Sequence, residues 1–281
     1  MNLPGNTQLP FFAYGLFKPG QLCYFRIKDF VESTSPAEIN GYLKERDGIP
    51  LLIIAENHLK IKGVLIRFKS NYENEAYKRI VEIEPDKVYK WDECTIAENL
   101  KVNLLIGNRP ERGSKDFDGE SWNGTNDLLF STALEEIEDI LKNNTNCDWS
   151  CKPLLRLQMA YVLLWSGLER YASLRYYLGK PNKTGQSIYK DKILKIAEEE
   201  VFAKSLKNHI KQTRKVYSSD ELETCTLDPD NPKKSIEYYY QVRSNSVHRG
   251  KTIFDDFKTL QFSLHELLAI FKDLLNDAWN S

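Results

Sequence analysis

Residues 238–251 place Arg243 and His248 five positions apart, with Asn245 between them. Histidine titrates near neutral pH and can move protons, and the planar guanidinium of arginine binds phosphate oxygens through paired hydrogen bonds. Cleavage of RNA through its own 2′-hydroxyl needs a group that takes a proton, a group that returns one, and a cation beside the phosphate. Asn245 is expected to bind the phosphate or to orient the imidazole. The pattern predicts a ribonuclease site that requires neither a metal nor a cofactor.

The spacing also sets a geometric condition on this site. Residues five positions apart on a regular helix point about 140° away from each other. Arg243 and His248 therefore share one pocket only if the helix breaks, for which Gly250 is a candidate, or if two protomers join their motifs across a two-fold axis. The alternative is structural: Arg243 forms an ion pair within the fold, and His248 is an ordinary histidine at a helix end.

The elements that position these residues fall into two parts. Short apolar and aromatic runs in the first 108 residues predict strands, and three-four spacing predicts two helices. The predicted strands span residues 9–16, 37–43, 51–55, 61–68, 89–96 and 101–106, and the predicted helices span residues 21–30 and 71–83. Asp47-Gly48-Ile49-Pro50 has the composition of a turn. Residues 1–108 are thus predicted to form a small, mostly antiparallel, barrel-like α+β domain.

The residues after the first predicted strand, Tyr14-Gly15-Leu16-Phe17 and the following Lys-Pro-Gly, resemble the Tyr-Gly loop of the gamma-glutamylcyclotransferase-like (AIG2-like) family. Later pieces come in the same order, and the resemblance covers residues 9–106. It implies that Tyr14, Gly15, Leu16 and Phe17 bind a gamma-glutamyl small molecule through backbone N–H groups. It also implies that Glu84 is the catalytic carboxylate, which relays a proton while the substrate closes into 5-oxoproline.

Two positions depart from the pattern of that family. Leu16 stands where a small hydroxyl residue is usual, and Pro85 stands where glycine usually follows the glutamate. The alternative interpretation is that Tyr14-Gly15 is only a turn after a strand and that Glu84 is an ordinary carboxylate at a helix end.

Residues 109–127 are rich in Gly, Asn, Asp, Arg and Ser, which predicts a linker. Beyond it, apolar residues recur at helical spacing, so residues 128–281 are predicted to form an all-α helical bundle. The predicted helices span residues 128–141, 153–178, 191–216, 235–247 and 252–279.

Within this bundle, Arg243 and His248 followed by Arg249-Gly250 resemble the Arg-x4-His motif of the HEPN superfamily, many of whose members cleave RNA. The resemblance covers residues 128–278. It implies a homodimer, RNA as the substrate, and a role in toxin-antitoxin or phage-defence systems with an antitoxin as partner. The leading hypothesis is a ribonuclease whose N-terminal pocket is a sensor or regulator. The alternatives are a gamma-glutamyl cyclotransferase with an accessory helical dimerisation domain, and a binding module without catalysis.

Composition limits the partners and the cellular location that the sequence allows. The formal net charge is −1 over 281 residues, so a nucleic-acid surface has to be local. The five cysteines are scattered without a metal-binding or disulfide spacing, which favours a reducing cytoplasm. No apolar run reaches the length of a membrane span and no secretory signal is evident, so a cytoplasmic protein without a membrane partner is expected.

Overall fold

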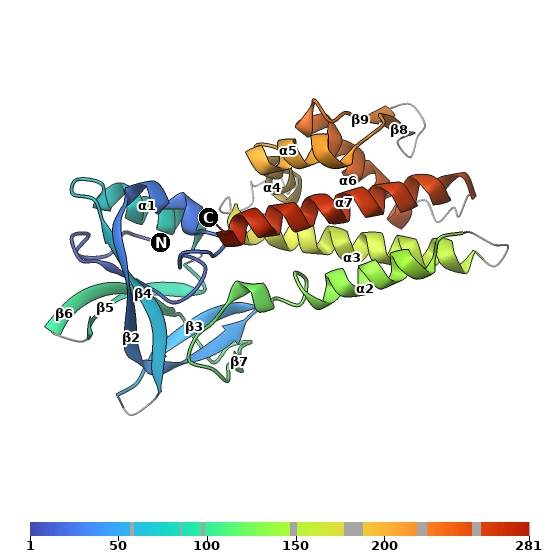
Figure 1. The fold of residues 1–281 in the computed structure, drawn as a ribbon. Coiled ribbons are helices and arrows are strands. Elements are labelled where there is room, and N and C mark those ends of the chain that lie inside the picture. Colours follow the sequence, from blue (N-terminus) through green and yellow to red (C-terminus); the bar gives the residue numbers. More distant parts are fainter. Residues whose placement is uncertain are drawn as a thin grey trace. The chain divides into compact units, whose positions relative to one another are not determined.

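The computed structural model describes residues 1–56, 59–84, 86–96, 99–146, 151–176, 188–217, 224–248 and 254–280. Two compact units divide the chain (Figure 1). The first, called here the N-terminal unit, is built on Met1–Thr125, and the second, the helical unit, is built on the described residues between 126 and 277. Each unit has its own hydrophobic core.

The N-terminal unit is a sheet of seven described strands with one α-helix (Figure 1). Neighbouring strands follow the order β3-β2-β4-β1-β6-β5, and β7 pairs with β2. The strands are β1 (Phe11–Ala13), β2 (Val31–Arg46), β3 (Ile49–Ile54), β4 (Lys60–Phe68), β5 (Tyr89–Ile96), β6 (Leu100–Gly107) and β7 (Lys115–Asp116).

All of these pairings are antiparallel except that of β1 with β6. The long strand β2 pairs with β4 along most of its length and then with β3, so it belongs to two parts of the sheet. Strand β3 also lies close to β6, which makes the sheet nearly closed. The predicted mostly antiparallel, barrel-like α+β architecture of this part is confirmed.

A tight turn joins β2 to β3. Asp47 and Gly48 have φ angles of 51° and 73°, the pair of positive values that a two-residue hairpin turn requires. Arg46 faces Ile49 in the register on either side of this turn. The Asp-Gly pair therefore fixes Arg46 at the end of β2.

Helix α1 (Glu73–Ile83) buries one face, formed by Ala76, Tyr77, Ile80 and Ile83. It ends at Glu84, whose backbone is extended (φ −78°, ψ 122°) and whose N–H donates to the Ile80 carbonyl at 3.0 Å. The helix predicted at residues 21–30 is instead two short 3-10 helices, η1 (Tyr24–Arg26) and η2 (Lys28–Phe30). Backbone hydrogen bonds between residues three apart replace the α-helical pattern there.

The helical unit holds the other described α-helices (Figure 1). They are α2 (Thr132–Asn143), α3 (Lys152–Arg175), α4 (Ile188–Ile196), α5 (Glu200–His209), α6 (Pro232–His248) and α7 (Phe254–Asn280). Helix α3 is buried on several sides because apolar residues occupy most of its circumference. No described helix has the combination of length and apolar character that crossing a membrane would require.

One part of the helical unit departs from the expected all-α pattern. The single helix predicted at residues 191–216 is divided into α4, α5 and a strand, β8 (Arg214–Tyr217), which pairs with β9 (Thr224–Leu227) in an antiparallel hairpin. Contacts distant in sequence favour the strand, because the Arg214 guanidinium binds the Glu266 carboxylate of α7. Such contacts override local helix spacing.

The segment predicted as a linker, residues 109–127, makes specific contacts with the N-terminal sheet. It contains β7 and the short 3-10 helix η4 (Gly124–Asn126). The Trp122 side chain is only 3% exposed. The Lys62 N–H donates to the Glu120 carbonyl at 2.7 Å, and the Phe117 N–H donates to the Leu43 carbonyl at 3.1 Å.

Candidate functional site

Glu84 is a buried carboxyl at the end of α1. Its relative exposure is 7%, and among the described residues no hydrogen bond reaches its carboxyl oxygens. Burial raises the pKa of this carboxyl from 4.5 to about 8, because the charged form loses its hydration. The group is therefore mainly protonated at pH 7, and its ionised form is accessible a single pH unit above neutrality.

Two tyrosines share the buried region with Glu84. Its charge contributes to raising the pKa of Tyr14 and of Tyr89, after the larger effect of their own burial, so the three side chains lie within electrostatic reach. The Tyr14 hydroxyl donates to the Leu105 carbonyl at 2.7 Å and accepts from the Leu52 N–H at 3.2 Å. These bonds hold Tyr14 between β6 and β3. The Tyr14 hydroxyl therefore makes no hydrogen bond to the Glu84 carboxyl.

The loop after β1 carries open backbone donors. Within the described part of the chain, the N–H groups of Gly15, Leu16 and Phe17 have no hydrogen-bond acceptor. Leu16 and Phe17 are buried, with 7% and 3% exposure. Unpaired N–H groups are uncommon in buried residues because each costs free energy, so the N–H groups of Leu16 and Phe17 are candidate donors to a ligand oxygen.

The same loop is fixed by its own turns and by packing. The Lys18 N–H donates to the Gly15 carbonyl at 3.1 Å, and the Cys23 N–H donates to the Leu16 carbonyl at 3.0 Å. A Cβ on Gly15 would lie 3.0 Å from Pro50 Cγ, so the close neighbour that glycine accommodates here is a side chain of the protein.

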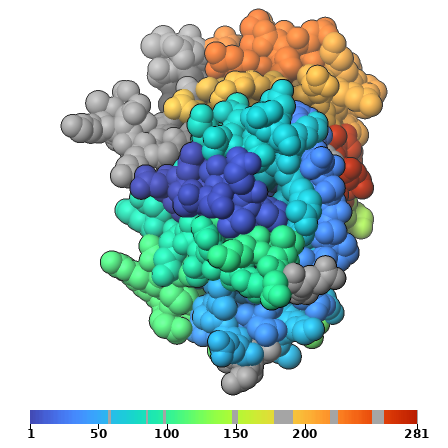
Figure 2. Space-filling model, turned by 90° about the vertical axis from the view of Figure 1, so that its left-hand side faces the viewer, coloured from blue at the N-terminus to red at the C-terminus, as the bar shows by residue number. Residues whose placement is uncertain are grey.

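The segment before β1 crosses β5 and β6. Trp91 Nε1 donates to the Asn2 carbonyl at 2.9 Å, and Asn103 Nδ2 donates to the Asn6 carbonyl at 2.7 Å. Figure 2 shows this segment, in dark blue, lying on one face of the N-terminal unit. These two hydrogen bonds hold the segment against β5 and β6.

In the helical unit, α6 carries the predicted Arg-His motif. The preceding aromatic run packs mainly inward, since Tyr238 and Tyr239 are fully buried and the Tyr161 hydroxyl donates to the Tyr239 carbonyl at 3.0 Å. Tyr240 is 38% exposed and contacts the ring of Trp165. These contacts fix the rotation of α6 about its axis and thereby the direction in which Arg243 projects.

Arg243 is half-buried and uncompensated. Its Nε is buried without a hydrogen-bond partner, and its guanidinium forms no ion pair with any carboxylate in the described residues. An arginine that has lost hydration without gaining a carboxylate is predisposed to bind an anion.

The other motif residues differ in what surrounds them. Asn245 Nδ2 donates to the Tyr217 carbonyl at 2.9 Å and its Oδ1 accepts from Gln241 Nε2 at 2.8 Å, so this amide ties α6 to β8 and keeps one free N–H donor. His248 is the last residue of α6, and its side chain lies outside the described residues, as do Arg249 and Gly250. The helix is continuous from Arg243 to His248, so the backbone has no break between the two positions.

Sequence patterns did not single out two residues near the Glu84 site. Tyr89 was expected as the start of a strand and as one piece of the family resemblance, but without a role in the site, and its place near Glu84 depends on the fold. The positive charge of Arg46 acts to lower the pKa of the Tyr89 phenol, against the larger effect of burial. Arg46 therefore lies within electrostatic reach of Tyr89. Across the described ranges, no three His, Cys, Asp or Glu side chains are grouped to hold a metal ion.

Comparisons with known proteins add little to this geometry. No protein-family profile matches the chain, and no curated protein sequence matches it. Among solved structures, the uncharacterized protein PH0828 from Pyrococcus horikoshii is similar over 47% of this chain and 97% of its own, with 20% sequence identity and a TM-score of 0.31. A similarity at this score carries no argument about function.

Proposed function

We propose that the N-terminal unit is a small-molecule enzyme that closes a gamma-glutamyl amide into 5-oxoproline, with Glu84 as the group that transfers protons. The observation that carries the proposal is the Glu84 carboxyl, which is 7% exposed, has a pKa of about 8 and lacks a hydrogen-bond partner among the described residues. Strongly perturbed acids of this kind are concentrated at functional sites. The proposal assigns the unpartnered N–H groups of the Tyr14 loop to the same site.

The reaction needs no co-reactant. The α-amine nitrogen of the substrate attacks the carbonyl carbon of its own side-chain amide, and a new C–N bond closes the five-membered ring. Ionised Glu84 takes a proton from the attacking nitrogen and delivers it to the departing nitrogen as the old C–N bond breaks. In this proposal the N–H groups of Gly15, Leu16 and Phe17 stabilise the negative charge that develops on the carbonyl oxygen. Because the carboxyl must be ionised to begin, activity should rise with pH up to about 8.

The test is release of 5-oxoproline from a gamma-glutamyl dipeptide by the full chain. Glu84→Gln should abolish the release, whereas Glu82→Gln, an exposed change on the same helix, should leave it intact. Absence of product with the unaltered chain across a panel of gamma-glutamyl dipeptides, or equal activity in the two variants, would show that Glu84 does not perform this chemistry.

A ribonuclease activity of the helical unit is the second candidate. The uncompensated guanidinium of Arg243 favours it, since a scissile phosphate would supply the missing anion. In this proposal His248 transfers protons between the 2′-hydroxyl and the leaving 5′-oxygen. The second N–H of the Asn245 amide, which does not bond to Tyr217, binds a phosphate oxygen. The N-terminal site then acts as sensor or regulator of a toxin or defence nuclease, with an antitoxin as a candidate partner.

A two-fold dimer is part of the ribonuclease proposal. Since α6 is continuous through the motif, positions 243 and 248 lie about 140° apart around the helix axis. In this proposal Arg243 of one protomer therefore completes a site with the histidine of a second protomer.

The ribonuclease test is cleavage of single-stranded RNA in the presence of EDTA. His248→Ala should abolish cleavage, and His265→Ala, which changes an exposed histidine on α7, should not. Equal cleavage by the unaltered chain and by His248→Ala would refute the assignment.

A further inference from the structure

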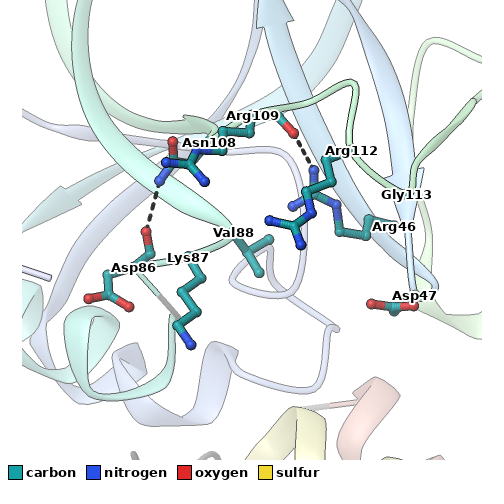
Figure 3. Close-up of a pocket in the computed structure, with 9 residues that line it drawn as sticks. All are labelled: Arg46, Asp47, Asp86, Lys87, Val88, Asn108, Arg109, Arg112 and Gly113. Atoms are coloured by element: carbon teal, nitrogen blue, oxygen red, sulfur yellow. Dashed lines mark hydrogen bonds between the residues drawn. The ribbon is translucent and has the colours of Figure 1, made fainter.

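A cavity of about 660 Å³ opens in the N-terminal unit, and four of its lining side chains are cationic: Arg46, Lys87, Arg109 and Arg112. We name it the cationic pocket. Two carboxylates, Asp47 and Asp86, also line it, so positive groups outnumber negative ones by four to two. Figure 3 shows Arg46 and Arg112 on one side of the pocket, Asp86 and Lys87 on another, and Arg109 beside Asn108 between them.

The four cations of the pocket are not neutralised. None of them forms an ion pair with a carboxylate in the described ranges. Two acids that neighbour these cations in sequence form ion pairs with other residues: Glu45 binds Lys115, and Glu111 binds Lys44. Positive charge therefore exceeds the negative charge of Asp47 and Asp86 in the pocket lining.

Backbone geometry holds the pocket in place. Asn108 is fixed by its N–H, which donates to the Val88 carbonyl at 2.7 Å, and by Nδ2, which donates to the Asp86 carbonyl at 3.0 Å. Arg109 has a φ of 54°, a conformation that a residue with a side chain adopts only under constraint. One end of Arg46 donates to the Arg109 carbonyl, while its Nε is buried without a partner. The arginines thus lie on ordered backbone before any ligand arrives.

We propose that the cationic pocket binds a small molecule through a phosphate or diphosphate group. Guanidinium groups match phosphate oxygens in paired hydrogen bonds, and a cavity of this volume falls in the range of small-molecule sites. The carboxylates Asp47 and Asp86 are suited to hydroxyl groups on the remainder of such a ligand. The proposal is independent of both functions proposed above, because Glu84 and Arg243 do not line the pocket.

The experiment is calorimetric titration of the full chain with inorganic pyrophosphate at 0.15 M salt, which screens interactions between exposed charges. Arg112 is exposed and its guanidinium has no partner in the described ranges, so Arg112→Gln should fold normally. It should weaken pyrophosphate binding about tenfold or more, the usual effect of one charge-assisted hydrogen bond. Lys87→Gln should weaken binding in the same direction. The matched control is Arg67→Gln, an exposed arginine of β4 outside the pocket, which should leave affinity unchanged.

Several results would overturn the proposal. These are the absence of pyrophosphate binding, equal weakening by Arg67→Gln and Arg112→Gln, and binding of malonate as tight as that of pyrophosphate. A further contrary result is that Arg112→Gln weakens binding of single-stranded RNA while pyrophosphate does not bind, because the surface would then serve nucleic acid.

Discussion

Glu84 should make the N-terminal unit less stable as the pH rises, and Glu84→Gln should remove this dependence. The carboxyl has a folded-state pKa of about 8 against 4.5 for the free group. Between these values the unfolded chain has released a proton that the folded chain still holds, so the free energy of unfolding falls by about 1.4 kcal/mol for each pH unit. Above pH 8 the loss reaches about 5 kcal/mol, a large part of the stability of a typical domain. Below pH 4.5 both states are protonated and the loss vanishes.

The assay is amide hydrogen exchange of the full chain, followed by mass spectrometry on peptides from β6. That strand lies inside the sheet, next to β1 and β5. Comparing the two proteins at each pH cancels the intrinsic pH dependence of exchange. Glu84→Gln should exchange about 3-fold more slowly at pH 5 and up to about 300-fold more slowly at pH 7. Glu82→Gln should follow the unaltered chain at every pH. A ratio of rates that stays constant between pH 5 and pH 8 would refute the burial argument, because the proton would then be bound equally in both states.

Three further predictions concern single contacts. Mixing Arg243→Gln with His248→Ala should restore about a quarter of wild-type RNA cleavage, because half of the dimers are mixed and each has one intact site; no recovery in a cleavage assay would exclude a shared site. Tyr14→Phe should lower the free energy of unfolding by about 1–3 kcal/mol in urea titration, since the Leu105 carbonyl and the Leu52 N–H lose their partner. Arg214→Met should cost about 3 kcal/mol in the same measurement by leaving the partly buried Glu266 carboxylate without its ion-pair partner, and a loss below 1 kcal/mol would contradict the importance of that ion pair.

The parts of the fold that local chemistry determines were predictable. The alternation of apolar residues located the strands from residue 31 to 107, although β2 is longer than predicted, and Asp47-Gly48 marked the hairpin turn that has positive φ at both residues. Helical spacing likewise located α2, α3, α6 and α7 to within a few residues. The hairpin of β8 and β9 was missed because its strands are stabilised from other elements: Asn245 of α6 donates to the Tyr217 carbonyl, and Glu266 of α7 binds Arg214.

The composition of residues 109–127 illustrates a second limit. A polar, glycine-rich segment has the same composition whether it is a free linker or a loop packed on a sheet. Here Trp122 is buried, and Arg109 and Arg112 contribute to the cationic pocket together with Arg46, more than 60 positions earlier in the chain. No spacing rule connects these residues, so only the fold brings them together.

The indications of function in this protein come from hydrogen bonds and ion pairs that certain side chains lack, rather than from the residue types themselves. A glutamate after a helix is common, but the Glu84 carboxyl is unusual because it is buried within electrostatic reach of Tyr14 and Tyr89, whose hydroxyl groups donate to the Leu105 and Pro50 carbonyls instead. Arginines are equally common, but Arg243 and the arginines of the cationic pocket have no carboxylate in the described ranges to neutralise them. Folding tends to pair buried and clustered charges because unpaired ones cost free energy. The uncompensated acid and arginines therefore favour the ligands proposed above, a gamma-glutamyl amide at Glu84 and phosphate groups at the arginines.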